Sequence, residues 1–216
     1  MSLENLSAAA VIVASVLGVP QAPPAVLVTE SADCGVLDSE QPCRFTQATS
    51  EYQLGRDGYL ERRDAAGQLA TMRLVLEDGF LIERAEFLRV GDDLLLICEV
   101  EDVEVAAGVV ARLDGASLRL KWRLHFPAFN ISIGVAEGSS LYLAGIGTVA
   151  AIDLEQGRYR WKHEGLYDRA RYSFNSFEVP EVGPTDVVFR ERLTAPEAGR
   201  PRLVRVSKVT GRLSKE

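Results

Sequence analysis

Two histidines are the first residues in the sequence with the chemistry of a catalytic base. They are His125 and His163, the only histidines among 216 residues. A hydrolase would need a nucleophile beside such a base, and the chain contains no Gly-x-Ser-x-Gly elbow. His125 follows Trp122 by three positions, and His163 follows Trp161 by two. We therefore predict that both are strand-end residues.

A glycine-rich segment at residues 145–150 (GIGTVA) matches the fingerprint of dinucleotide-binding proteins. That fingerprint needs a following helix, whose N-terminus holds the pyrophosphate. The residues that follow are instead β-branched and reach a turn at Gly157. The segment therefore predicts a hairpin turn between two strands.

Acidic side chains gather at the end of an apolar run, at Glu99, Glu101, Asp102 and Glu104. One interpretation is a docking surface for a basic partner, or a weak Ca²⁺ site. The other is a solvated edge strand, in which charges discourage pairing between sheets. The spacing lacks the order of a calcium loop, so a metal is the weakest option. Paired carboxylates of a glycosidase type cannot be identified from the sequence.

Basic and aromatic side chains alternate over residues 158–172. Such interleaving can bind single-stranded nucleic acid, but strand alternation explains its first half equally well. The second half is predicted to connect two sheets, and exposed aromatic and basic side chains there are suited to a partner. The predicted contacts are Tyr167, Arg169, Arg171 and Tyr172.

The three cysteines are too few for a disulfide scaffold or a cysteine-rich metal site. Cys34 and Cys43 enclose a loop rich in Gly, Asp, Ser and Pro, and would form a disulfide in an oxidising compartment. Two reduced thiols are the alternative. Cys98 lies in an apolar run and is predicted to be a core thiol.

Residues 1–25 are either a signal-like segment or a buried strand. The apolar run Ser7–Val19 is too short to span a membrane and precedes a small-residue site at 20–22. Against export, the leading segment carries Glu4 and no Lys or Arg. A periplasmic or secreted location is our first hypothesis, with a cytoplasmic protein as the alternative. Residues 26–216 are predicted to form a single domain.

Composition excludes several classes of protein. Apolar residues make up 47% and charged residues 25%, as in globular proteins, which excludes a disordered tail, a collagen and a coiled-coil rod. A net charge of −7 argues against a generally basic nucleic-acid-binding protein. The charge is divided unevenly, since residues 1–105 are acidic overall and residues 106–216 are basic.

The remaining pattern predicts strands and an internal repeat. Short segments rich in Val, Ile and Leu alternate with turn residues, and no sustained helical period follows residue 20. Two blocks, residues 113–122 and 152–161, each place an Asp eight residues before a Trp. Weaker copies occur at residues 62–69 and 206–213, with turn positions at 67, 118, 157 and 211. The repeat residues of the two strong blocks are Asp114, Trp122, Asp153, Gly157 and Trp161.

These blocks resemble the quinoprotein-type (PQQ-like) β-propeller repeat. The resemblance is strong for residues 136–165, good for 90–126, weak for 182–215 and faint before residue 70. It implies an all-β fold, a small or partial propeller of about four four-stranded blades. The alternatives are a small closed propeller, an open arc, or a propeller that closes by self-association. Members that bind the quinone have vicinal cysteines, and this chain has none. The resemblance therefore extends to the repeat and not to the active site, and we expect no cofactor.

The function that we expect is non-catalytic recognition of a protein partner, as an assembly scaffold or an inhibitor. We expect no nucleic-acid partner and no membrane span. This expectation rests on analogy between folds. The alternative is an enzyme, a hydrolase with a carboxylate-based site in the central funnel of the propeller.

Overall fold

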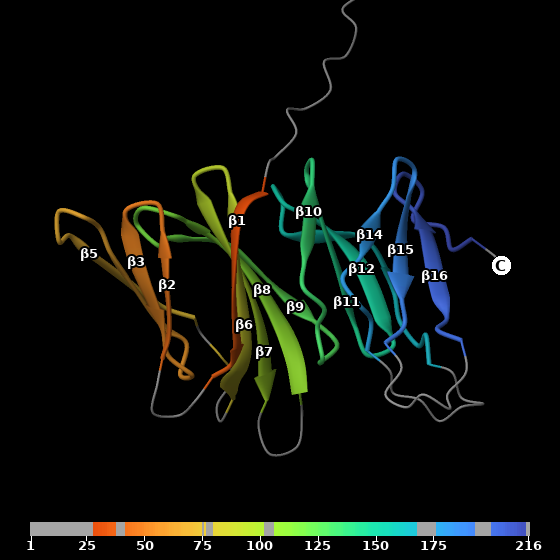
Figure 1. Ribbon diagram of the computed structural model, residues 1–216, viewed down its shortest axis with the longest axis horizontal. Helices are drawn as coiled ribbons and strands as arrows, with labels where there is room; N and C mark the ends of the chain where they lie inside the picture. Colours follow the sequence, from red (N-terminus) through yellow and green to blue (C-terminus); the bar gives the residue numbers. More distant parts are fainter. Residues whose placement is uncertain are drawn as a thin grey trace, which may run out of the picture.

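The computed structural model describes residues 28–37, 42–74, 76, 80–101, 106–167, 176–192 and 200–214. All regular structure in these residues is β, which confirms the predicted fold class. The strands form four antiparallel sheets that follow one another in chain order, as consecutive blades of a partial β-propeller (Figure 1). The first and last sheets lie at opposite ends of the row.

The first described strand belongs to the second sheet, although it precedes the strands of the first sheet in the chain. The first sheet has the order β2-β3-β4-β5, and the second has β1-β6-β7-β8-β9, so β1 is a fifth strand beside β6. The described part of the chain therefore begins with a strand of the second sheet, forms the first sheet, and then returns to the second. The bounds are β1 (Val28–Val36), β2 (Cys43–Gln47), β3 (Ser50–Leu54), β4 (Tyr59–Arg63), β5 (Leu69–Arg73), β6 (Leu81–Val90), β7 (Asp93–Glu101), β8 (Ala106–Asp114) and β9 (Leu120–Phe126).

The third sheet is a four-stranded meander and the fourth has three strands in its described part. An isolated bridge between Val206 and Leu213 continues the fourth sheet on its outer side. The bounds are β10 (Val135–Glu137), β11 (Ser140–Gly145), β12 (Thr148–Asp153), β13 (Arg158–His163), β14 (Glu181–Val182), β15 (Asp186–Arg190) and β16 (Leu203–Ser207).

Each pair of neighbouring sheets encloses its own apolar layer. Leu60 and Leu96 belong to the layer between the first and second sheets. Ile97 and Leu143 belong to the next layer, and Phe189 to the last. Because β7, β11 and β12 lie inside the row, both of their faces are buried, and they are almost continuously apolar.

The predicted repeat is visible in the four turns that join the last two strands of each block. The first turn residue is Asp64, Asp114, Asp153 or Ser207, and in each case its side-chain oxygen accepts backbone N–H groups of the turn. The N–H of Ser117 is the main cause that lowers the pKa of Asp114. A later residue in each turn has a positive φ, at the four predicted positions 67, 118, 157 and 211. Three of these residues are glycines, and the fourth is Leu118.

Two details of the strands lie outside the predicted repeat. A turn at Gly91, whose φ is +62°, allows β6 to fold back onto β7. The second sheet has a fifth strand, because β1 is added beside β6. Strand β1 precedes the part of the chain with a clear repeat, so the repeat could not predict it.

Candidate interaction surface

The two repeat tryptophans join neighbouring sheets. The indole Nε1–H of Trp122 donates to the Leu154 carbonyl oxygen at 2.8 Å, and the ring covers Gly157 of the third sheet. A Cβ on Gly157 would lie 2.4 Å from the Trp122 ring, so this close approach requires glycine. Trp161 covers Gly211 of the fourth sheet in the same way. Both tryptophans thus pack on the turn glycine of the next sheet, although the buried Nε1–H of Trp161, unlike that of Trp122, has no hydrogen-bond partner in the structure.

A buried charge network reinforces the junction between the second and third sheets. Arg112 Nε donates to Asp93 at 2.6 Å, and its Nη1 donates to the Leu154 carbonyl at 2.7 Å. Lys121 contacts both carboxylate oxygens of Asp93. The sequence analysis missed this network because its members are far apart in the chain.

The acidic cluster proposed as a partner surface is divided by the structure. Glu99 is mostly buried, accepts the backbone N–H groups of Asn130 and Ile131 at 3.0 and 2.9 Å, and pairs with Arg84. Its carboxylate thus holds the connection between β9 and β10. Glu101 is exposed at the end of β7. Asp102 and Glu104 lie outside the described residues.

Glu86 is the most perturbed carboxyl group near this connection. The residue is 5% exposed, its Oε2 accepts the Gly134 N–H at 2.9 Å, and its Oε1 has no hydrogen-bond partner in the structure. Burial raises the pKa of Glu86 to about 7, and the charge of Asp33 adds to the rise, while the Gly134 N–H and Arg84 oppose it. The adjoining cavity measures about 10 Å³, which is about the volume that one water molecule needs.

At the end of the third sheet opposite its repeat turn, the hairpin turn between β11 and β12 supports two exposed aromatic side chains. Phe129, 41% exposed, accepts the Ile146 N–H through its carbonyl oxygen. Tyr167, 45% exposed, places its ring directly over Gly147, where a Cβ would lie 2.4 Å away. The predicted contacts Arg169, Arg171 and Tyr172 lie outside the described residues.

The GIGTVA segment at residues 145–150 forms this hairpin turn and the start of β12. Residues 145 and 148 face each other across the turn, and β12 follows directly. No helix begins there to bind a pyrophosphate. The segment is a tight turn with Gly147 at a φ of +65°, as predicted.

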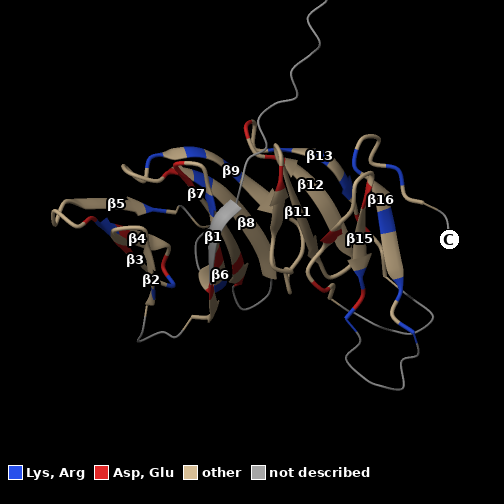
Figure 2. Cartoon of the chain, turned by 45° about the horizontal axis from the view of Figure 1, so that its top comes forward, with Lys and Arg blue, Asp and Glu red and all other residues tan. Residues whose placement is uncertain are grey.

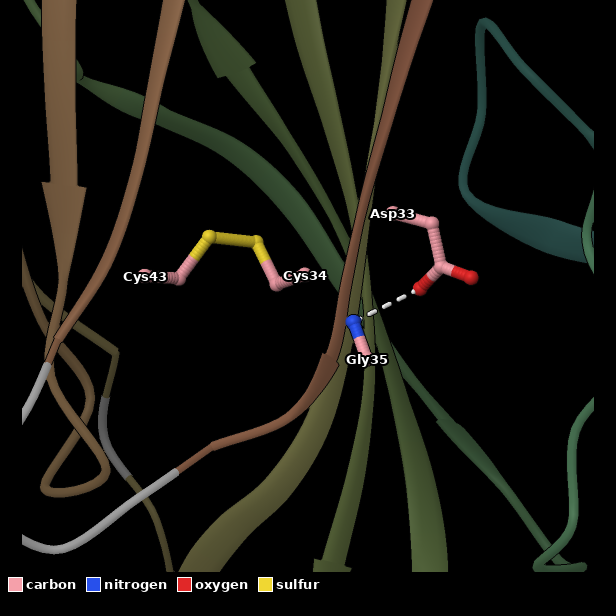
Figure 3. Close-up of a disulfide and its surroundings, with 4 residues drawn as sticks. All are labelled: Asp33, Cys34, Gly35 and Cys43. Carbon is pink, nitrogen blue, oxygen red and sulfur yellow. Dashed lines mark hydrogen bonds between the residues drawn. A yellow bond between two sulfur atoms is a disulfide. The ribbon is translucent and has the colours of Figure 1, made fainter.

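Cys34 and Cys43 are joined by a disulfide (Figure 3). Cys34 lies on β1 and Cys43 begins β2, so the bond links a strand of the second sheet to a strand of the first. Beside it, Asp33 accepts the Gly35 N–H at 2.9 Å. Cys98 is a free, buried thiol, and burial raises its pKa.

The two histidines serve structural contacts. The His125 carbonyl oxygen accepts the Tyr159 hydroxyl at 2.6 Å. The His163 ring nitrogen Nε2 lies 2.7 Å from the Gly211 carbonyl oxygen in the next sheet. Within the described ranges, no group of three or more His, Cys, Asp or Glu side chains is arranged to hold a metal ion.

Comparison with known proteins gives remote structural likeness alone. No family model and no curated protein matches the chain. The chain is similar to BamB from Moraxella catarrhalis at 13% identity and a TM-score of 0.35, covering 87% of this chain and 66% of BamB. It thus spans about two thirds of the length of BamB.

Two further solved structures are similar at the same level. The computationally designed Ika8 protein has 10% identity and a TM-score of 0.36, with 84% of this chain and 76% of Ika8 covered. A chain of the mitotic checkpoint complex has 10% identity and a TM-score of 0.38, with 95% and 74% covered. The blade assignment rests on the strand order and register given above. No described helix is long and apolar enough to cross a bilayer.

Proposed function

We propose that the protein is a non-catalytic binding module that recognises a protein partner through the end of the third sheet that carries the β11–β12 turn. The observation behind this proposal is the pair of exposed aromatic residues, Phe129 and Tyr167, which both contact this turn. Aromatic residues on a rigid support are the usual anchors of protein interfaces, because they bury much area at a small entropic cost.

The opposite end offers fewer such anchors. Its four repeat turns are short and their backbone groups are satisfied internally by Asp or Ser side chains. Loops that carry function on rigid scaffolds are typically the longer connections. The role of assembly scaffold or inhibitor is thus assigned to the end that presents Phe129 and Tyr167.

The alternative, a carboxylate-based hydrolase, has one observation in its favour, the raised pKa of Glu86. The cavity beside Glu86 has room for a single water molecule and none for a substrate. Glu86 and Glu99 instead hold the backbone of the β9–β10 connection. We therefore favour binding over catalysis.

An oxidising compartment, periplasmic or extracellular, fits the Cys34–Cys43 bond. The location is tested by sequencing the N-terminus of the native protein and by counting its free thiols after denaturation. A processed N-terminus and one free thiol would support export. Three free thiols would indicate a reducing compartment.

The binding role is tested with three immobilised proteins: the wild type, a Phe129→Ser/Tyr167→Ser variant, and a Val209→Ser variant. Val209, 91% exposed, lies in a repeat turn at the other end and is the matched control. We expect a host protein, once purified, to bind the wild type and the control alike and the double variant at least about tenfold more weakly. Equal binding to all three proteins would refute the surface, and turnover of a substrate without any partner would favour the hydrolase.

A further inference from the structure

We infer that a groove between the first two sheets binds an acidic, extended segment of a partner protein that inserts one aromatic side chain. The groove lies on the outer rim at the turn end, away from Phe129 and Tyr167, and goes beyond the function proposed above. Its volume is about 530 Å³. The lining comes from β5 and from the turn and strand after β8, and it consists of Thr71, Met72, Arg73, Ser117, Leu118, Arg119, Leu120 and Arg123.

The repeat is broken at the junction where this groove lies. The junctions can be compared at the strand residue that lies two positions before the turn Asp. In the second and third sheets this residue pairs with a tryptophan: Arg112 pairs with Trp122, and Ala151 pairs with Trp161. In the first sheet the corresponding pair is Arg62 with Ala70. A large indole ring is thus replaced by a methyl group where the first sheet meets the second.

The second sheet compensates in part. Its turn carries Leu118 where the other three turns carry glycine, and this leucine has a φ of +58°. A left-handed conformation is costly for a branched side chain, and such strain is often found at functional sites. The Leu118 side chain is fully buried and, with the partly buried Met72, belongs to the apolar layer between these sheets. Together they form an apolar floor, while the space above it remains open.

The positive charge of the residues that line the groove favours an acidic partner. Three of the lining residues are arginines, Arg73, Arg119 and Arg123, and none of the described lining residues is acidic. Arg73 also pairs with Asp57 at 3.3 Å, but both side chains are exposed, so this ion pair is weak and exchangeable. Figure 2 shows Lys and Arg where the turn runs into β9, beside a first sheet that also contains acidic residues. Arginine forks bind carboxylates well, which favours a segment rich in Asp and Glu.

The shape of the groove favours a polypeptide. Both flanking strands, β5 and β9, are outer edges of their sheets, so an extended chain can pair with their free backbone groups. Leu120 is exposed at the margin and offers a contact for an inserted ring. An aromatic side chain from the partner would fill the place that Trp122 and Trp161 fill at the later junctions.

The test uses a fluorescein-labelled decapeptide with one Trp flanked by Glu and Asp residues, and fluorescence anisotropy at low ionic strength. We expect a dissociation constant no weaker than about 0.1 mM, and at least about tenfold weaker binding when the Trp is replaced by Ala or the acids by amides. Salt should weaken the binding, since the arginines contribute to it.

Three variants locate the site. Arg119→Glu should weaken binding at least about tenfold, whereas Arg158→Glu, the exposed residue one position after the turn glycine in the third sheet, should change it less than about twofold. An Ala70→Trp/Leu118→Gly variant rebuilds the later junctions and should abolish binding.

Four results would overturn the proposal. The first is no binding of the peptide to the wild-type protein at 1 mM, on the order of ten times the expected constant. The second is binding that persists in the rebuilt variant, and the third is an equal loss of binding with Arg158→Glu and Arg119→Glu. The fourth is Arg119-dependent binding of anionic phosphatidylglycerol vesicles without binding of the peptide, which would assign the groove to a membrane surface.

Discussion

The closest contact between two blades gives a sharp test of the repeat. At Gly157 the φ is +61°, and an added Cβ would lie 2.4 to 2.8 Å from three atoms of Trp122. At Gly67, the turn glycine of the first sheet, the φ is +79° and nothing lies within 4 Å. The substitutions Gly157→Ala and Gly67→Ala therefore share the backbone strain and differ in the clash.

The strain of a left-handed Ala costs about 1–2 kcal/mol, partly offset by roughly 0.4–1 kcal/mol from the lower entropy of the unfolded chain. Gly67→Ala should thus lower the free energy of unfolding by about 1 kcal/mol. At Gly157, forcing the Trp122 ring aside adds about 1–3 kcal/mol, for a total of about 2–4 kcal/mol.

The assay is urea denaturation, followed in parallel by circular dichroism and tryptophan fluorescence. With a slope of about 2–3 kcal/mol/M, Gly157→Ala should lower the midpoint by about 1 M, and Gly67→Ala by less than half of that. Gly211→Ala should behave like Gly157→Ala, because its Cβ would lie 2.7 Å from Trp161. Equal losses at Gly67 and Gly157 would refute the packing of tryptophan on glycine between blades.

Three further predictions address the disulfide, the buried acid and the irregular turn. Replacing Cys34 and Cys43 by Ser should lower the free energy of unfolding by about 2–3 kcal/mol, because the bond, with a sequence separation of 9, restricts the entropy of the unfolded chain. Dithiothreitol should lower the free energy of unfolding of the wild type by the same amount and leave the variant unchanged. The fold raises the pKa of Glu86 from 4.5 to about 7, so the folded state binds the proton more tightly than the unfolded state does. The resulting contribution to the free energy of unfolding is fully present below pH 4.5. It is lost, by up to about 3 kcal/mol, as the pH rises to about 7. Glu86→Gln should remove that loss in denaturation curves measured between pH 4.5 and 8, and an unchanged pH dependence would contradict the assignment. Leu118→Gly should cost about 1–3 kcal/mol, since the lost burial exceeds the relieved strain, and adding Ala70→Trp should recover at least about 1 kcal/mol in the same denaturation assay.

The sequence revealed the repeat because each turn needs a particular chemistry. A side-chain oxygen must accept turn amides, as at Asp64 and Ser207, and a later residue must adopt a positive φ. These requirements are local, so they survive in the weak copies. They also placed Leu118 correctly as a turn residue, although its type is unusual for a positive φ.

The first sheet was hard to recognise for a physical reason. Its strands alternate between buried and exposed residues, since one face meets the second sheet and the other meets solvent. Inner strands such as β12 are buried on both faces and give a continuous apolar signal. An end blade therefore loses half of the pattern that identifies the repeat, which explains the faint resemblance before residue 70.

The candidate sites depended on contacts between distant residues and were less predictable. The acidic run at Glu99 looked like a surface cluster, but the register of β6 and β7 places Arg84 opposite Glu99, and the β9–β10 connection uses its carboxylate. Phe129 was missed because a single aromatic residue beside Pro127 has no periodic pattern. Its exposure is set by the turn at Ile146, which is distant in sequence.

The outward faces of the first and fourth sheets are polar, which is relevant to whether a second copy of the chain closes the propeller. On the first sheet, the face away from the core carries Glu51, Glu61 and Arg63, with Arg63 paired to Glu61. On the fourth, Arg205 pairs with Asp186, while Val206 and its apolar neighbours point toward the third sheet. Polar outer faces are what terminal repeats need in order to remain soluble. Closure by a second copy would therefore bury the charged side chains of these described outer faces without covering a large apolar surface.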